Sequence, residues 1–339
     1  MRGGGRTGPL AARHRLNRTL YPVSTPPPAR VILDCDPGID DALAIVFACG
    51  HPGLDLSGVT TVSGNVDLGQ VTSNALSVLE LAGRPEVPVV PGSARPLLRP
   101  VAGARDVHGE SGLGAATLPP ARAGAASGHA VDFLIGQIGA APGEIILVAT
   151  GPLTNIALAV RREPRLAGWV RDFVIMGGSA GRGNTTPAAE FNIWADPEAA
   201  AIAFSAGWQV TMVGLDVTRL ARATPAVQDR LRPLGRLASD LLLPGLLGYR
   251  GQATPGDPAS GPAVHDVLAL ALVAEPALFG CQPARVEVET AGQWTAGMTV
   301  TDFGAEPHRH NALVAMSIDV PAFWGTVLDA YARIPAARA

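Results

Sequence analysis

The chain alternates between short, nearly continuous apolar runs and longer stretches with helical periodicity. The short runs predict buried strands at 31–34, 56–62, 87–90, 144–149, 172–176 and 209–215. The longer stretches predict helices at 40–50, 67–83, 129–140, 153–162 and 196–207. Apolar strands separated by helices are typical of a parallel sheet whose two faces are both covered. The pattern therefore predicts an α/β fold with a mainly parallel open sheet and helices on both faces.

The rest of the chain extends this pattern without dividing it. A helical region is predicted at 221–248, a further helix at 264–275, and late strands within 284–318 before a C-terminal helix. The pattern shows no internal repeat and no linker within the body. We expect one Rossmann-like α/β domain over 31–335, preceded by a disordered basic extension at 1–30 that holds six arginines and no acidic residue.

Composition excludes several classes of function. All 26 basic residues are arginine, so Schiff-base chemistry and a P-loop lysine are excluded. Without the six arginines of the extension, 20 basic residues face 29 acidic ones, a formal charge of −9 that disfavours nucleic acid as a partner. The chain has no apolar run long enough to span a membrane, so no membrane association is expected.

Three cysteines, Cys35, Cys49 and Cys281, are too few for a disulfide framework or a zinc site. Their apolar sequence context predicts that all three are buried structural thiols. Such cysteine usage fits a reducing cytoplasm, and we expect the protein to be cytoplasmic.

Polar residues gather where the predicted strands end. They occur as an aspartate-rich stretch at 34–41, SGN at 63–65, TGPLTN at 150–155, MGGSAGRGNTTPAAEFN at 176–192 and VHD at 264–266. In an open parallel sheet, ligands bind outside the carboxyl ends of the strands. These segments therefore predict a single functional site at that edge.

Four aspartates, Asp34, Asp36, Asp40 and Asp41, fall within eight positions. Each by itself is explained by a turn or by the start of a helix, where an acid gains about 0.3–1 kcal/mol. A turn and a helix start do not explain the four aspartates together, because two carboxylates ~4 Å apart repel by about 4 kcal/mol at an effective dielectric of 20. The cluster must hold a proton or a cation. Oxygen ligands without paired His or Cys favour Ca²⁺ or Mg²⁺.

A D-x-D pair after a first strand also occurs in phosphatases of the haloacid dehalogenase type, where the first aspartate is the nucleophile. Those enzymes most often use a downstream lysine to hold the phosphoryl group. Here Pro37 and Gly38 follow the pair and lysine is absent, which disfavours that interpretation.

Six ordered segments together resemble the inosine–uridine nucleoside hydrolase family over about residues 31–330. They are DCDPGIDDALAI, VSGN, ATGPLTNIALA, MGG, GNTTPAAEFNIWADPEAA and VHDVLALA. The resemblance implies the nucleoside hydrolase fold and hydrolysis of the N-glycosidic bond of a ribonucleoside at bound Ca²⁺, giving ribose and free base. It also implies a homodimer or homotetramer that acts in nucleoside catabolism and in purine or pyrimidine salvage.

The resemblance also implies a ligand set for the cation. Carboxylates of Asp36, Asp41 and Asp266 would bind Ca²⁺ together with the backbone carbonyl of Thr150. Asp36 would be the general base on the attacking water, and Asn65 would orient that water. A cation beside the water and carboxylates around the sugar suit a reaction in which positive charge develops on the ribose ring.

Five residues would hold the ribose according to the same resemblance. Asp40 would bind a hydroxyl, and Met176, at a predicted strand end, would line the sugar pocket, with packing in the core as the alternative. Asn184 and Glu190 would lie towards the 5′-hydroxyl, with Asn192 towards the 3′-hydroxyl. Amides and carboxylates suit a sugar whose hydroxyl groups both donate and accept hydrogen bonds.

Three residues are expected at the end of the site that holds the base. His265 would protonate the leaving base, although Val267 stands where family members commonly have proline; a hydrogen-bonded histidine at a helix start is the alternative. His108, in the glycine-rich loop 107–114, would contact sugar or base, and a solvent-facing histidine is the alternative. Tyr249 would contact the base, against the alternative of a rim tyrosine without a role.

A second hypothesis is a family member that keeps the fold and the cation but binds a nucleoside-like ligand without turnover. The intact set of acidic and amide residues argues against it. The sequence leaves the choice between purine and pyrimidine open.

Overall fold

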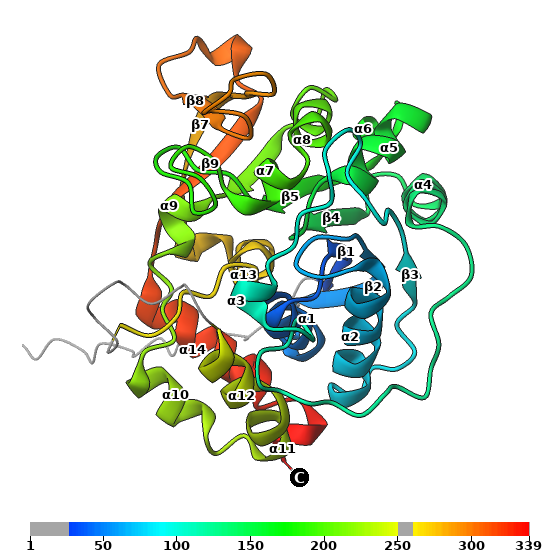
Figure 1. The fold of residues 1–339 in the computed structure, drawn as a ribbon, viewed down its shortest axis with the longest axis vertical. Helices are drawn as coiled ribbons and strands as arrows, with labels where there is room; N and C mark the ends of the chain where they lie inside the picture. Colours follow the sequence, from blue (N-terminus) through cyan, green and yellow to red (C-terminus); the bar gives the residue numbers. More distant parts are fainter. Residues whose placement is uncertain (1–26, 250–259, 339) are drawn as a thin grey trace, which may run out of the picture.

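The computed structural model describes residues 27–249 and 260–338, and their strands form one nine-stranded sheet in the order β3-β2-β1-β4-β5-β6-β9-β7-β8 (Figure 1). The strands are β1 (Ala29–Cys35), β2 (Leu54–Thr61), β3 (Val89–Pro91), β4 (Ile145–Ala149), β5 (Asp172–Met176), β6 (Val210–Val213), β7 (Phe279–Val288), β8 (Thr299–Asp302) and β9 (Ala312–Ile318). All pairings from β3 to β9 are parallel, whereas β7 is antiparallel to β9 and to β8. The predicted α/β fold class is confirmed.

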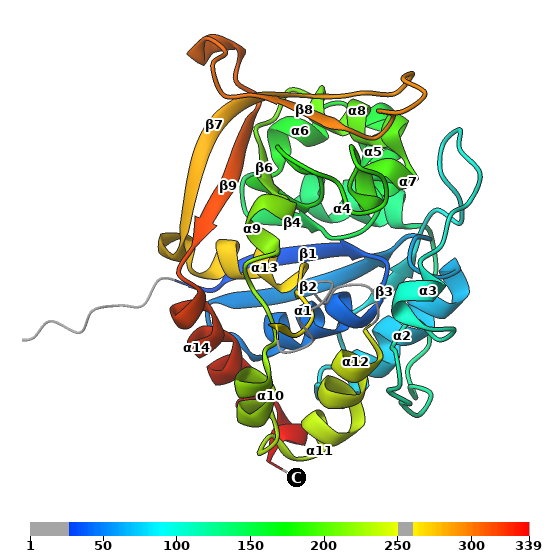
Figure 2. The ribbon, with the colours of Figure 1, turned by 60° about the vertical axis from the view of Figure 1, so that its left-hand side comes forward.

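The central strands of the sheet are buried on both faces, which explains why β1 and β4 are apolar at nearly every buried position. Val31 and Leu33 of β1 point into one core and Ile32 points into the other. The first core lies under α1 (Ile39–Gly50), α2 (Leu68–Leu81), α13 (Val267–Ala274) and α14 (Val320–Tyr331). The second lies under α4 (Ala130–Ala140), α5 (Thr154–Arg162) and α8 (Pro197–Phe204). Figure 2 shows these helix layers on opposite sides of β1 and β2.

Several short helices connect these elements near the ends of the strands. They are α3 (Arg105–His108), α6 (Leu166–Trp169), α7 (Phe191–Ala195) and α9 (Leu215–Thr218), with single 3₁₀ turns at Pro276–Leu278, Pro307–Arg309 and Pro335–Ala337. Of these, α3, α7 and α9 become important for the site described below.

The helical region predicted at 221–248 is broken into pieces. It comprises α10 (Pro225–Leu231), α11 (Gly235–Leu237), a π-helical turn (Ala238–Leu242) and α12 (Leu243–Gly248). Gly235 has a positive φ of 46°, which a continuing helix does not allow, and it follows Pro233 closely. Backbone chemistry at these two positions therefore overrides the helical periodicity.

Two further expectations need correction or fall outside the structure. Only Cys35 is fully buried; Cys49 is partly buried, and Cys281 is exposed because the first half of β7 is largely uncovered. Most of the extension predicted at 1–30 lies outside the described residues, and β1 already begins at Ala29. In the described part of the chain, no helix has the length and apolar character needed to cross a bilayer.

The position of the functional edge follows from the strand order. The chain passes from β1 outward to β2 and β3, and then returns to the other side of β1 through β4, β5 and β6. The connections after β1 and β4 therefore leave the sheet on opposite sides. A crevice forms at such a switch point, outside the carboxyl ends of the two strands.

Candidate active site

The first acidic segment is built by the turn from β1 into α1. Asp36 follows the last residue of β1, Pro37 and Gly38 turn the chain, and Asp40 and Asp41 lie in the first turn of α1. Asp41 Oδ2 accepts the Gly38 N–H at 3.0 Å, which caps the helix. All three aspartates are buried. The turn after the strand and the helix start at these aspartates agree with the sequence pattern.

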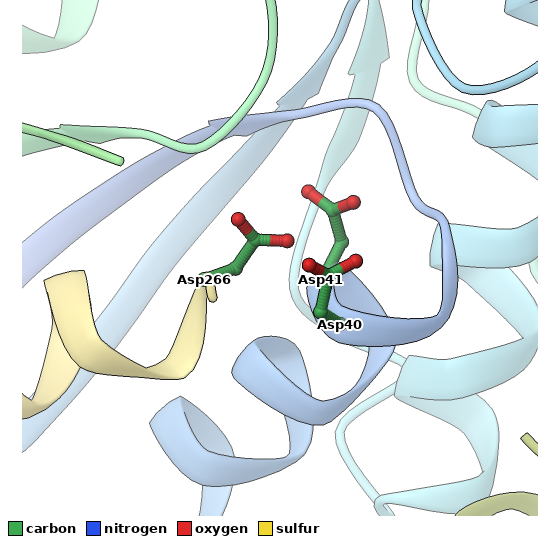
Figure 3. Close-up of side chains that lie close together, drawn as sticks. All are labelled: Asp40, Asp41 and Asp266. Carbon is green, nitrogen blue, oxygen red and sulfur yellow. The ribbon is translucent and has the colours of Figure 1, made fainter. Parts of the chain in front are cut away.

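A third buried carboxylate comes from a distant helix. Asp266 is the N-cap residue of α13, and Figure 3 shows it facing Asp40 and Asp41. Oxygen atoms of these three side chains lie within 4.8 Å of one another. Burial raises the pKa values of all three, and repulsion from neighbouring carboxylates raises the pKa of Asp41 further, to about 6, and that of Asp266 to well above its usual range. A cation would relieve this repulsion.

Asp36 lies beside this cluster with one oxygen bound and one without a partner. Its Oδ2 accepts the Asn65 backbone N–H at 2.7 Å, whereas Oδ1 has no hydrogen-bond partner among the described residues. Gly64 and Gly151 pack against the carboxylate so closely that a Cβ at either would overlap it. Burial and the charge of Asp41 raise the pKa of Asp36 well above its usual range. An oriented, buried and unpartnered oxygen is suited to accept a proton or to bind a cation.

Amide and hydroxyl groups fix the oxygens around these aspartates. Thr150 Oγ1 donates to Asp41 Oδ1 at 2.8 Å, and the Thr150 carbonyl accepts from Asn192 Nδ2 at 2.7 Å. Asn65 Nδ2 donates to Asp41 Oδ2 at 3.2 Å and to the Asp36 carbonyl at 3.1 Å. The atoms that these groups leave in position to coordinate a cation are therefore all oxygens, which fits a hard divalent cation.

Asp34, the fourth aspartate of the cluster in sequence, has a different environment. Its Oδ1 accepts from Thr60 Oγ1 at 2.5 Å and from Asn155 Nδ2 at 2.8 Å. Burial raises its pKa to about 7. Asp34 therefore joins the ends of β1 and β2 to the start of α5.

A cavity of about 550 Å³ opens over the acidic cluster. Of the residues predicted from sequence, eleven line it: Asp40, Asn65, His108, Thr150, Met176, Asn184, Glu190, Asn192, Tyr249, His265 and Asp266. Asp36 and Asp41 are not among the lining residues, although their hydrogen bonds place them next to Asn65 and Thr150. Sequence reasoning missed Arg219 and Arg222, which also line the cavity. Their position just after β6, at the same edge of the sheet, was the available signal.

The wall formed by the 177–190 loop and α7 holds two of the polar residues predicted to bind sugar. Glu190 Oε2 accepts the backbone N–H groups of Gly178 at 2.9 Å and Ile193 at 3.2 Å, and so caps α7. Burial raises the Glu190 pKa to about 7. Asn184 Oδ1 accepts the Phe191 N–H at 3.0 Å. Both side chains are therefore anchored at the start of the same helix.

The opposite wall holds two histidines and a tyrosine. His265 Nδ1 pairs with Thr218 Oγ1 at 2.8 Å, and burial together with the charge of Arg219 lowers the pKa of His265 to about 3. His108 Nδ1 accepts the Ile39 N–H at 3.1 Å, and burial lowers its pKa to about 4. Both rings are therefore neutral near pH 7.

Two alternatives from the sequence are thereby excluded. His108 is buried and lines the cavity, so it is not a solvent-facing loop residue. Tyr249 is buried as well, and its hydroxyl donates to Asp40 Oδ2 at 2.8 Å while its ring contacts His108 at a centroid distance of 5.1 Å. Tyr249 therefore does not lie at the exposed rim of the cavity.

Comparisons with known proteins agree with this geometry. A family model described as inosine-uridine preferring nucleoside hydrolase matches residues 31–325. The chain is 44% identical over 310 residues to the inosine-uridine preferring nucleoside hydrolase of Leishmania major, covering 91% of this chain and 98% of that protein. It is 43% identical over 307 residues to the non-specific ribonucleoside hydrolase RihC of Salmonella typhi, covering 90% and 98%.

Solved structures show the same similarity over nearly the whole fold. The purine-preferring ribonucleoside hydrolase from Gardnerella vaginalis superimposes with a TM-score of 0.85 at 32% identity, covering 91% of this chain and 99% of that one. A plant nucleoside hydrolase superimposes with a TM-score of 0.80 at 33% identity, covering 90% and 99%.

Proposed function

Because the chain belongs to the inosine-uridine preferring nucleoside hydrolase family and is an N-glycosyl hydrolase, we propose that it releases ribose from ribonucleosides with bound Ca²⁺ and Asp36 as general base. The observation that carries this proposal is the buried carboxylate cluster at the switch point, next to the unpartnered Oδ1 of Asp36. The relatives are named for inosine and uridine, for purines, or for no particular base. The family therefore supports ribonucleosides as the class of substrate, and the residues that line the cavity would determine which nucleobase is accepted.

The residues that would hold the cation are Asp36, Asp41, Asp266 and the carbonyl of Thr150. Their oxygen donors and raised carboxylate pKa values support a doubly charged, hard ion. The flexible coordination of Ca²⁺ favours it over Mg²⁺ in a set that mixes carboxylates with a main-chain carbonyl. When bound, the ion would lower the pKa of a water and help to orient it.

Asp36 is suited to take the proton from that water. The Asn65 backbone N–H holds Oδ2, so the carboxylate is fixed in orientation while Oδ1 remains available. The Asn65 side chain donates to both the Asp36 carbonyl and the Asp41 carboxylate. It would thereby keep the proposed base, Asp36, in a fixed position relative to the proposed cation ligand Asp41. A fixed base within reach of its proton is what general base catalysis requires.

The ribose would lie between the acidic cluster and the 177–190 loop. Asp40 would accept from a ring hydroxyl, and Asn192 would lie towards the 3′-hydroxyl. Asn184 and Glu190 would meet the 5′-hydroxyl, the first donating from its amide and the second accepting at its carboxylate. Met176 would line the sugar pocket, and its carbonyl also accepts from Asn192 Nδ2 at 3.0 Å.

The base would then face His108, Tyr249 and His265. We propose His265 as the proton donor to the departing base. With a pKa of about 3, its imidazolium is a strong acid that is sparsely populated at neutral pH. Proton delivery by His265 therefore weakens as the pH rises, a dependence that kinetics can detect.

Ribose release from inosine, adenosine, guanosine, uridine and cytidine, with and without a Ca²⁺ chelator, tests the proposal directly. We expect release that the chelator suppresses and added Ca²⁺ restores. Release that is unaffected by chelation would refute the metal-dependent mechanism. Nucleoside binding without any ribose release would instead indicate the non-catalytic alternative.

The family resemblance also leads us to propose a homodimer or homotetramer in the cytoplasm. The three free cysteines support a reducing compartment. Sedimentation velocity of the purified protein measures the oligomeric state, and a monomer at micromolar concentration would contradict this part of the proposal.

A further inference from the structure

Arg219, which directly follows α9, ties two walls of the cavity together. Its Nη1 donates to the Arg182 carbonyl at 3.0 Å, and its Nη2 donates to the Gly183 carbonyl at 2.6 Å. One planar guanidinium therefore bridges two successive carbonyls of the 177–190 loop, a fork geometry that lysine cannot reproduce. Arg219 lines the cavity itself, but none of the roles derived above uses it.

The loop segment that Arg219 holds is a tight turn. The Gly183 N–H donates to the Pro187 carbonyl at 3.1 Å, and the Asn184 N–H donates to the Ala189 carbonyl at 3.2 Å. A Cβ at Gly183 would overlap the backbone of Ala189 and Thr186, so the turn closes on itself. Its two outward carbonyls are the ones that accept from Arg219.

This turn delivers Asn184 to the cavity. Because Asn184 Oδ1 accepts the Phe191 N–H, the amide Nδ2 is the group able to donate to a substrate. Glu190, the neighbour of Phe191, offers an acceptor from the same wall. Asn184 is exposed, in contrast to the buried Glu190, so its position depends on how firmly the turn is held.

Charged side chains of both signs act on the Arg219 guanidinium. The carboxylates of Asp216 and Glu190 favour its charged form, whereas burial, Arg182 and Arg222 lower its pKa. Asp216 also accepts the Ala180 N–H at 2.7 Å, so α9 holds the loop at a second point.

We propose that Arg219 is a positioning residue for the ribose 5′-hydroxyl. By holding the carbonyls of Arg182 and Gly183 it keeps Asn184 beside Glu190, which preorganises a donor and an acceptor for that hydroxyl. Arg219 thereby sets how strongly the enzyme distinguishes nucleosides with and without a 5′-hydroxyl. This inference rests on the proposed ribonucleoside hydrolysis.

The test compares inosine with 5′-deoxyinosine, which have the same leaving base. We expect the wild type to prefer inosine by about 100-fold or more in kcat/KM, because a site built for a hydroxyl rejects the analogue that lacks it. In Arg219→Ala the ratio of the two kcat/KM values should fall to within about tenfold, because inosine loses more activity than 5′-deoxyinosine. The ratio is the reading used, since the effect of the lost Arg219 charge on the pKa of His265 acts on both substrates alike. Arg219→Lys should fall between the two, since one ammonium cannot serve both carbonyls.

Arg182→Ala is the matched control, because it removes an arginine from the same loop but leaves the carbonyl that Arg219 uses. It should keep the wild-type preference. If Arg219→Ala lowers kcat/KM equally for both substrates, so that the preference for inosine is preserved, the proposal is overturned.

Hydrogen exchange provides a reading that does not depend on turnover. In Arg219→Ala, the amides of residues 183–186 should exchange at least about tenfold faster than in the wild type, and in Arg182→Ala they should not. Unchanged exchange in Arg219→Ala would overturn the positioning role. Absence of ribose release from wild-type protein would refute the proposed function instead, and the exchange result would still decide whether Arg219 holds the loop.

Discussion

The Asp36→Asn variant should be more stable than the wild type without metal and yet almost inactive. Asparagine has nearly the same size as aspartate and can keep the acceptor for the Asn65 N–H. It removes one negative charge from a fully buried group that lies near Asp41. The two effects have opposite signs because the same charge is unfavourable in the empty cluster and essential for the reaction.

The magnitudes follow from burial and charge. Two unit charges ~4 Å apart at an effective dielectric of 20 repel by about 4 kcal/mol. The wild type already relieves part of this by holding protons, since the pKa values of Asp36 and Asp41 are raised. We therefore expect a net gain of about 1–2 kcal/mol in the metal-free free energy of unfolding at pH 8. Loss of a general base should lower kcat by about 10²–10⁴-fold.

Two measurements on the same preparation check this prediction. Urea unfolding with chelator gives the free energy of unfolding, and ribose release from inosine with saturating Ca²⁺ gives kcat. Asp329→Asn, on the exposed side of α14, is the control and should change neither quantity. A kcat within tenfold of the wild type would refute Asp36 as the base, and a metal-free variant less stable than the wild type would refute the charge-crowding argument.

Three further predictions follow from the site. His265→Ala should impair nucleosides with poor leaving groups most and should remove the fall of kcat with rising pH; a wild-type profile that is flat from pH 6 to 9 would contradict the acid role. In chelator, stability should decrease as the pH rises from about 6.5 to 8, because Asp34 and Glu190, whose pKa values are raised to about 7, then lose protons in the folded state that the unfolded chain has already released; below pH 6.5 the lowered pKa values of His108 and His265 oppose this trend, and melting temperatures from pH 6.5 to 8 check the sign. Asn155→Ala should cost about 3 kcal/mol in urea unfolding, since it leaves the buried Ser93 N–H without its acceptor and removes a donor to the buried Asp34 carboxylate; a change below 1 kcal/mol would contradict these contacts.

The fold was largely predictable because its signals are local. Strands buried on both faces must be apolar at successive positions, so the six predicted runs correspond to β1–β6. The region 221–248 is largely helical as predicted, although Gly235 and nearby prolines divide it, and the prediction of a buried thiol was wrong for the exposed Cys281. Periodicity reports which residues prefer burial, whereas it does not report whether another element covers them.

Sequence by itself determined the β1–α1 turn and its acidic residues, because the spacing from Asp36 to Asp41 spans a single strand end, a turn and a helix start. The family resemblance extended this to distant residues, but not to their contacts. Only the tertiary structure placed Tyr249 on Asp40, 209 positions away, and set Arg219 against the carbonyls of the 177–190 loop. The same packing made His108 and His265 neutral. Such contacts depend on how separate elements meet over the sheet, and burial by those elements sets the pKa values, so no local pattern of residues encodes either.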